Sequence, residues 1–195
     1  MKMRDTDLNH MLTCYHEAGH GVVAHYWGEN PRGGIRAIRG TRGSCSTTIY
    51  ITPDMIRSAG TDLDREWVTR AAKAAVSIYW AGLLTECKYY GFRIPRGGDR
   101  PDKLVWLGDA ADPTEDVHKI KEIFKALGHN LRTKAGKAYA MSLQNETWDV
   151  ISEERTWRAI QDIAGRLLEK GEVSESEADG VFEKYRVPAE WYGVE

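Results

Sequence analysis

The sequence predicts one mainly α-helical (α+β) domain, a helical bundle with a single small β-hairpin. Three observations support this fold class. A chain of 195 residues has the length of one domain. Its 42% of hydrophobic residues can form a core. Apolar residues recur with a helical period through most of the chain, whereas strand-like alternation is confined to two neighbouring segments. We therefore expect a single domain over residues 1–195.

Within this domain, residues 1–112 are expected to hold a first helix, the hairpin and a second long helix. The first helix should run from Asp7 to about Trp27 and end at Gly28. Two strands are expected at Ile35–Arg39 and Ser46–Ile51, joined by a glycine-containing loop. Thr61 or Asp62 should cap the second helix, which should end at Gly91, before an irregular loop.

Residues 113–195 are expected to form a helical C-terminal part. Asp112-Pro113 is typical of a helix start, because aspartate caps well and proline suits the first turn. Helical periodicity then continues in three stretches: to Leu127, from Leu131 to Leu143 and from Ser152 to Leu168. A last short helix opens with the capping-box pattern Ser174-Glu175-Ser176-Glu177.

Charge and hydropathy exclude several classes of partner. The net charge is −2 and the sequence pI is near 6.3, so we expect no nucleic acid as the main partner. Arginines at 32, 36, 39 and 42 are interpreted as a solvated hairpin face. The longest nearly apolar run, Ala74–Leu84, is too short to cross a membrane. No signal core follows Met1, and three widely spaced cysteines suggest free thiols in a reducing cytoplasm (Cys14, Cys45 and Cys87).

The pattern His16-Glu17-Ala18-Gly19-His20 is the main functional signal. Residues four apart lie on one helix face, so His16 and His20 can offer imidazole nitrogens to one metal ion. Glu17 lies beside them and can accept a proton from a metal-activated water. The alternative is two solvated or core histidines with no metal.

A catalytic zinc usually has three protein ligands and one open position. His10 and His25 are at the wrong helical offset to share the face of the pair. Asp112 is a better candidate, because a capping aspartate is held rigidly at a helix start. Asp112 as a cap only, and Asp109 as a rival ligand, remain the alternatives.

Four stretches in this order resemble the protease domain of FtsH-type zinc metalloproteases. Tyr15–His20 resembles the family's H-E-A-G-H helix, and Ala81–Glu86, with Gly91 beyond it, is similar to a glycine-rich stretch ending in glutamate. Gly108–Asp112 resembles the segment that ends in the family's aspartate ligand. Trp157–Glu169 is similar to a late helix ending in L-L-E.

The resemblance implies a zincin-like metallopeptidase domain that binds one Zn²⁺ per chain. His16, His20 and Asp112 would be the ligands and Glu17 the catalytic base. The implied activity is hydrolysis of peptide bonds in peptides or in unfolded or flexible protein segments. Glu86 is either a partner that orients a histidine or a solvated helix residue.

The chain also departs from the family pattern. It has no phosphate-binding loop, so we expect ATP-independent activity. It has no apolar run long enough to cross a membrane, so we expect no membrane insertion. The expected partners are a peptide or protein substrate and, as an option, further copies of the chain in a homo-oligomer. Asp116 stands where the family has a small residue. The alternatives are a non-catalytic zinc-binding regulatory or interaction protein, a structural helical domain, and a hydrolase of non-peptide bonds. The strand Ser46–Ile51 is a further candidate edge for an added peptide strand.

Overall fold

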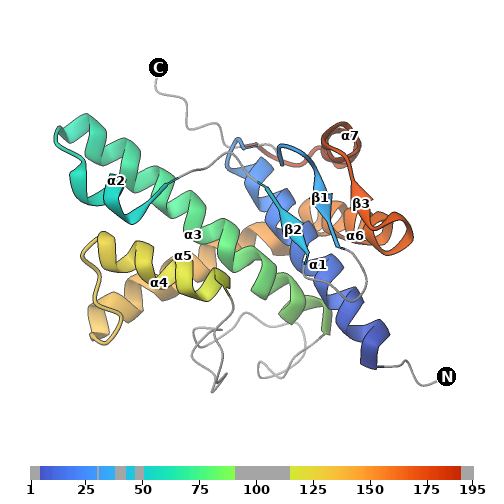
Figure 1. Ribbon diagram of the computed structural model, residues 1–195, viewed down its shortest axis with the longest axis horizontal. Coiled ribbons are helices and arrows are strands. Elements are labelled where there is room, and N and C mark those ends of the chain that lie inside the picture. Colours follow the sequence, from blue (N-terminus) through green and yellow to red (C-terminus); the bar gives the residue numbers. More distant parts are fainter. Residues whose placement is uncertain (1–4, 30, 38–42, 47–50, 91–114, 190–195) are drawn as a thin grey trace.

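The computed structural model describes residues 5–29, 31–37, 43–46, 51–90 and 115–189. In these ranges the chain is mainly helical with one small antiparallel sheet, as the sequence predicts (Figure 1). The elements in chain order are α1 (Asp5–Tyr26), β1 (Ile35–Arg36), β2 (Ser44–Cys45), α2 (Pro53–Ser58), α3 (Asp62–Tyr90), α4 (Glu115–Ala126), α5 (Lys134–Ser152), α6 (Glu154–Lys170), β3 (Glu172–Val173) and α7 (Glu175–Tyr185).

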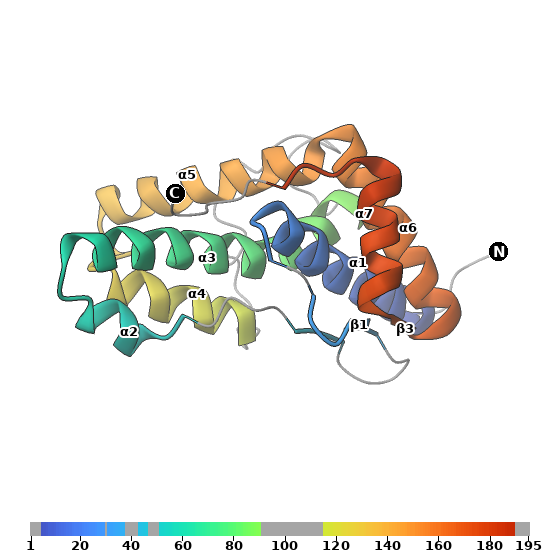
Figure 2. The ribbon, with the colours of Figure 1, turned by 90° about the horizontal axis from the view of Figure 1, so that it is seen from above.

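Two long helices, α1 and α3, pack against each other at the centre of the molecule. Helices α4 and α5 contact α3 and lie on opposite sides of it in Figure 2, while α6 packs on α1. The core between these helices contains large buried side chains such as Trp80, Phe124 and Ile160. Because α1 lies between α3 and α6, its residues from Cys14 to Ala24 are buried, apart from the half-buried His16, and are held in place.

The sheet lies beside α1, with strand order β2-β1-β3. Ile35 pairs with Cys45 on one side and with Val173 on the other, both antiparallel. The predicted hairpin is therefore present, but its second strand is Ser44–Cys45. The predicted range Ser46–Ile51 is wrong at its two described ends, where neither Ser46 nor Ile51 is in a strand. Residues 47–50 lie outside the described residues.

Most helix boundaries follow local capping signals. The N–H of Asp64 donates to the Thr61 hydroxyl at 3.1 Å, so Thr61 caps α3 as expected. The last predicted helix begins with the full capping box of Ser174 and Glu177. Helix α5 continues to Ser152, well beyond the predicted Leu143, because buried Trp148 and Ile151 extend its apolar face.

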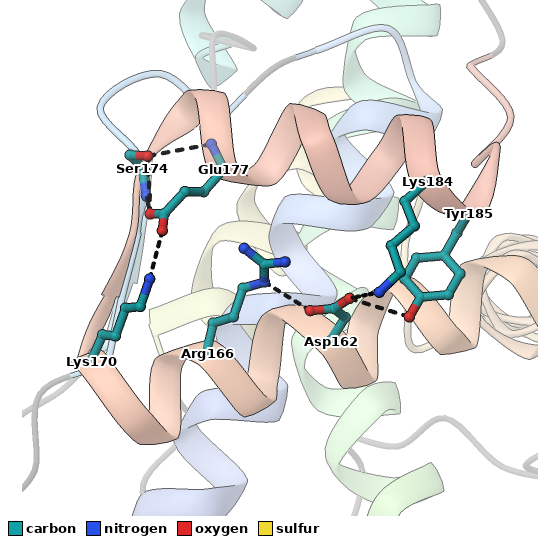
Figure 3. Close-up of polar contacts among 7 residues, drawn as sticks. All are labelled: Asp162, Arg166, Lys170, Ser174, Glu177, Lys184 and Tyr185. Carbon is teal, nitrogen blue, oxygen red and sulfur yellow. Dashed lines mark hydrogen bonds and ion pairs between the residues drawn. The ribbon is translucent and has the colours of Figure 1, made fainter.

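A group of polar contacts joins α6 to α7 and to Ser174, which follows β3 (Figure 3). The Asp162 carboxylate accepts hydrogen bonds from Arg166 Nε and Lys184 Nζ, each at 2.7 Å, and from the Tyr185 hydroxyl at 3.2 Å. At the other end, Lys170 Nζ lies 2.8 Å from Glu177 Oε1. Together these contacts fix α7 against α6, on the side of the molecule that carries β3.

Candidate metal centre

Three side chains from two helices meet at one point. His16 and His20 lie one turn apart on α1, with ring centroids 4.5 Å apart and planes at 83°. Asp116 comes from the first turn of α4. Its Oδ2 lies 2.9 Å from His16 Nε2 and 3.3 Å from His20 Nε2. One ligand atom from each of the three lies within 4.8 Å of the others, so the group could hold a metal ion.

Each histidine is also held through its second ring nitrogen. His16 Nδ1 lies 2.6 Å from Glu86 Oε1 on α3, and His20 Nδ1 lies 2.6 Å from the backbone carbonyl of Ile78 on the same helix. A carboxylate or carbonyl oxygen only accepts, so both Nδ1 atoms donate. Metal-ligating histidines usually have such an acceptor at the nitrogen that faces away from the metal.

Because both Nδ1 atoms carry the ring hydrogen, the lone pairs of both Nε2 atoms point at the Asp116 carboxylate. Lone pairs repel a negatively charged oxygen, so a positive charge is needed between the imidazoles and the carboxylate. Burial alone would lower the pKa of His16, but hydrogen bonds to Asp116 and Glu86 outweigh it and raise the pKa to about 10. Burial alone would raise the pKa of Asp116, yet its hydrogen bonds with His16 and His20 lower it. A proton can supply the positive charge at His16, and a metal cation would supply it to all three groups.

The donor set fits zinc. Two imidazole nitrogens and one carboxylate oxygen are ligands of the type found in catalytic zinc sites, which keep a fourth position open. Tetrahedral zinc with bonds of ~2.0–2.1 Å places its ligand atoms about 3.3 Å apart. The two measured separations from Asp116 Oδ2, 2.9 and 3.3 Å, are close to this value. All three ligand atoms lie within 4.8 Å of one another, a wider limit than the zinc geometry, so the side chains would have to adjust to accommodate the ion.

Glu17 is buried beside the histidines, with 7% of its surface exposed. Burial raises the pKa of its carboxyl above the ordinary value, and attraction to His20 and His16 opposes this effect. Gly43, just before β2, lies against Glu17: a Cβ atom there would be 2.3 Å from Glu17 Cγ. The absence of a side chain at residue 43 therefore lets the hairpin approach the carboxyl group closely.

Gly82 on α3 has the same role for His16. A Cβ atom at residue 82 would lie 2.6 Å from His16 Nε2 and 2.7 Å from two ring carbons. Any larger residue would move the imidazole or separate the helices. The glycine that the sequence places in the segment Ala81–Glu86 thus makes room for the ring that Glu86 orients.

The structure brings together three of the four predicted site residues: His16, Glu17 and His20. Asp112 and its rival Asp109 lie outside the described residues. Asp116, which stands where the resembled family has a small residue and was not among the predicted ligands, is the carboxylate that contacts both histidines. Its position one helical turn after Asp112 is the local signal that could have made it a candidate.

Comparison with known proteins adds no family assignment: no family model matches the chain, and no curated protein matches it. Among the described residues, no helix is both long and apolar enough to cross a lipid bilayer.

Proposed function

We propose that the protein is a zinc-dependent metalloendopeptidase related to the FtsH-type protease domain. The observation that carries the proposal is the convergence of His16 Nε2, His20 Nε2 and Asp116 Oδ2, with both Nδ1 atoms held by acceptors on α3. Contact between His16 and Glu86 supports the relation, because both residues belong to stretches that resemble the family. The proposal uses Asp116 as the third ligand in place of Asp112.

Zinc bound here would polarise a scissile carbonyl and would lower the pKa of a bound water molecule towards neutral. Glu17 would accept the proton of the attacking water and then donate it to the leaving amine. Its raised pKa suits both steps, because a carboxyl that is too acidic returns a proton poorly. His16, His20 and Asp116 would hold the metal, while Glu86 and the Ile78 carbonyl keep the two rings oriented.

The proposed substrates are peptides and flexible or unfolded protein segments, cleaved without ATP by the domain itself. Glu17 is 7% exposed and packs against Gly43, so an extended chain would reach its carboxyl more easily than the surface of a folded protein. We also propose a cytoplasmic protein with reduced cysteines, in line with the three free thiols in the structure.

The proposal is tested by comparing Glu17→Gln with wild type on unfolded, fluorescently labelled casein. We expect Glu17→Gln to keep one zinc per chain and to lose activity by at least about a hundredfold, because it removes the proton acceptor but no ligand. His16→Ala should lose both zinc and activity. Retention of cleavage by Glu17→Gln would show that Glu17 is not the base.

A second candidate function is a zinc-binding regulatory or interaction protein that cleaves nothing. The observation in its favour is the close cover of Gly43 over Glu17, which limits access to the carboxyl group. Such a protein would bind zinc through the same three ligands and leave the casein intact. The same experiment therefore separates the two functions.

A further inference from the structure

A lysine and a serine are in contact where α3 packs on α5 and α6 begins. Lys88, in the last turn of α3, donates from Nζ to the hydroxyl oxygen of Ser152 at 3.2 Å. Ser152 is the last residue of α5, and α6 begins at Glu154. Both side chains of the pair are half-buried, so part of each reaches solvent. A nucleophile and a base within hydrogen-bond reach of each other are the first requirement for covalent catalysis by a serine.

Two aromatic rings hold the lysine beside the serine. Lys88 Nζ lies 5.0 Å from the ring centroid of Trp157 and 5.4 Å from that of Trp148. Trp148 is on α5, about one helical turn before Ser152, and Trp157 is near the start of α6. Side chains from both neighbouring helices therefore fix the amine next to the hydroxyl group. Such a group, which orients the base, is the second requirement for an activated nucleophile.

The surroundings of Lys88 favour a neutral amine more than those of a comparable lysine. Burial lowers the pKa of the Lys88 ammonium group, and no carboxylate in the described part of the chain pairs with it. The indole rings attract an ammonium ion, which limits the lowering. Lys119 also lies over an aromatic ring, that of Tyr79, but it pairs with Glu115 at 2.7 Å. Burial alone would lower the pKa of Lys119, and the pairing raises it instead. A buried lysine without a carboxylate is the kind that acts as a base.

The pair of Lys88 and Ser152 is separate from the candidate metal centre. Lys88 follows Glu86 by two residues on α3, and side chains two apart on a helix point in different directions. Glu86 contacts His16 on α1, whereas Lys88 contacts side chains of α5 and α6. A reaction at this pair would therefore not depend on the metal proposed above.

We propose that Ser152 and Lys88 form a serine–lysine catalytic dyad that hydrolyses esters with an apolar acyl group. The neutral amine of Lys88 takes the Ser152 hydroxyl proton as Oγ attacks the ester carbonyl. The bond from the carbonyl carbon to the leaving oxygen then breaks, and Lys88 gives the proton to the departing alcohol. Water attacks the acyl-serine in the same way, which releases the acid and restores both side chains. The half-buried ring of Trp157 lies beside the amine and offers apolar surface to the acyl group.

Labelling of the full chain with an alkyl fluorophosphonate, with the adduct located by mass spectrometry, tests the nucleophile. We expect Ser152 to react at least about a hundredfold faster than Ser142. Ser142 is the matched control, an exposed serine of the same helix whose hydroxyl lies 3.2 Å from Glu146 Oε1. Equal labelling of the two serines, or no adduct on Ser152, would overturn the proposal.

Substitution of Lys88 tests the base. Lys88→Arg keeps a cationic donor between the two rings but cannot accept a proton, so labelling of Ser152 should fall by at least about a hundredfold. Lys88→Met, which removes the donor as well, should fall to the same level. A contact that only supports the fold would survive the change to arginine. Undiminished labelling in Lys88→Arg would therefore overturn the dyad.

Hydrolysis of p-nitrophenyl butyrate separates this activity from the proposed peptidase. EDTA should leave ester hydrolysis unchanged, and Ser152→Ala should lower kcat/KM by at least about a hundredfold, while Ser142→Ala has no effect. An intact ester, or hydrolysis that EDTA abolishes and Ser152→Ala retains, would overturn the dyad. Hydrolysis of the ester by a wild-type protein that cleaves no casein would support the dyad and contradict only the proposed function.

Discussion

His16 is held at both nitrogens of its ring, by Asp116 at Nε2 and by Glu86 at Nδ1. The second contact matters because it fixes both the tautomer and the orientation of a ligand whose lone pair must meet the metal. Glu86 does not need to touch the metal to control its affinity. Among residues that would not bind the metal, Glu86 is therefore the one at which a conservative substitution tests the site most directly.

We predict that Glu86→Gln weakens zinc binding by about ten- to a hundredfold while the protein remains folded. The amide keeps the shape of the side chain but loses the charge that supports the imidazole. Competition with a zinc chelator of known affinity measures the change. Glu66→Gln on the same helix is the matched control, because Glu66 is exposed and pairs only with Arg70 among the described contacts. Equal affinities in the two variants would contradict the role given to Glu86.

At the scale of elements, the site depends on the close approach of α1 and α3. We predict that Gly82→Ala destabilises the fold by about 1–3 kcal/mol, because its new methyl group overlaps the His16 ring. It should also weaken zinc binding, since the ring must move. Urea unfolding and chelator competition measure the two effects.

The control for this variant is Gly165→Ala on α6, where a Cβ atom would meet nothing within 4 Å. Alanine is the better helix former, so this change should raise stability by about 0.5–1 kcal/mol. A Gly82→Ala protein as stable as the Gly165→Ala protein would show that the helices are not packed as described.

The contact between α6 and α7 should depend on pH through Asp162. Burial alone would raise the pKa of this carboxyl, but hydrogen bonds from Arg166 and Lys184 outweigh it and lower the pKa. A carboxyl with a lowered pKa stabilises the fold above its unfolded value of about 3.9 and stops doing so as pH falls through the folded value. Wild type should therefore lose more stability than Asp162→Asn below about pH 4. If urea unfolding showed that the two proteins lose equal stability as the pH falls, the role given to Asp162 would be contradicted.

Local sequence signals predicted most elements but not all of their contacts. Thr61 and Ser174 mark their helix starts because capping involves residues only three positions apart. Strand β3 could not be predicted, since Glu172 and Val173 form a two-residue strand that pairs with β1 from far along the chain. Helix α2, by contrast, has a local signal that could have predicted it, the N-cap Thr52 followed by Pro53.

The candidate site likewise has one part that local spacing predicts and one part that depends on how distant segments pack. The i, i+4 spacing of His16 and His20 is a local property and could be predicted from the helix alone. Asp116 is 100 residues from His16, and its contact depends on how α4 packs against α3. No local pattern encodes that packing. The resemblance directed attention to Asp112 instead.

At the scale of the whole molecule, a metal at this site would join the start of α4 to the middle of α1. Zinc at a hundred times its dissociation constant adds about 2.7 kcal/mol to stability. We predict that EDTA lowers the Tm of the zinc-loaded protein by about 5–10 °C. Differential scanning calorimetry measures this, and His20→Ala should show no response. An equal shift in His20→Ala would place the stabilising metal elsewhere.

The zinc content of Asp116→Ala, by elemental analysis beside wild type, Asp112→Ala and Glu115→Ala, tests the central claim most directly. Glu115 precedes Asp116 on α4 and forms an exposed pair with Lys119, so it controls for the loss of a carboxylate in the same turn. We predict one zinc per chain in wild type, Asp112→Ala and Glu115→Ala, and none in Asp116→Ala. Full zinc content in Asp116→Ala, with loss in Asp112→Ala, would contradict the site described here.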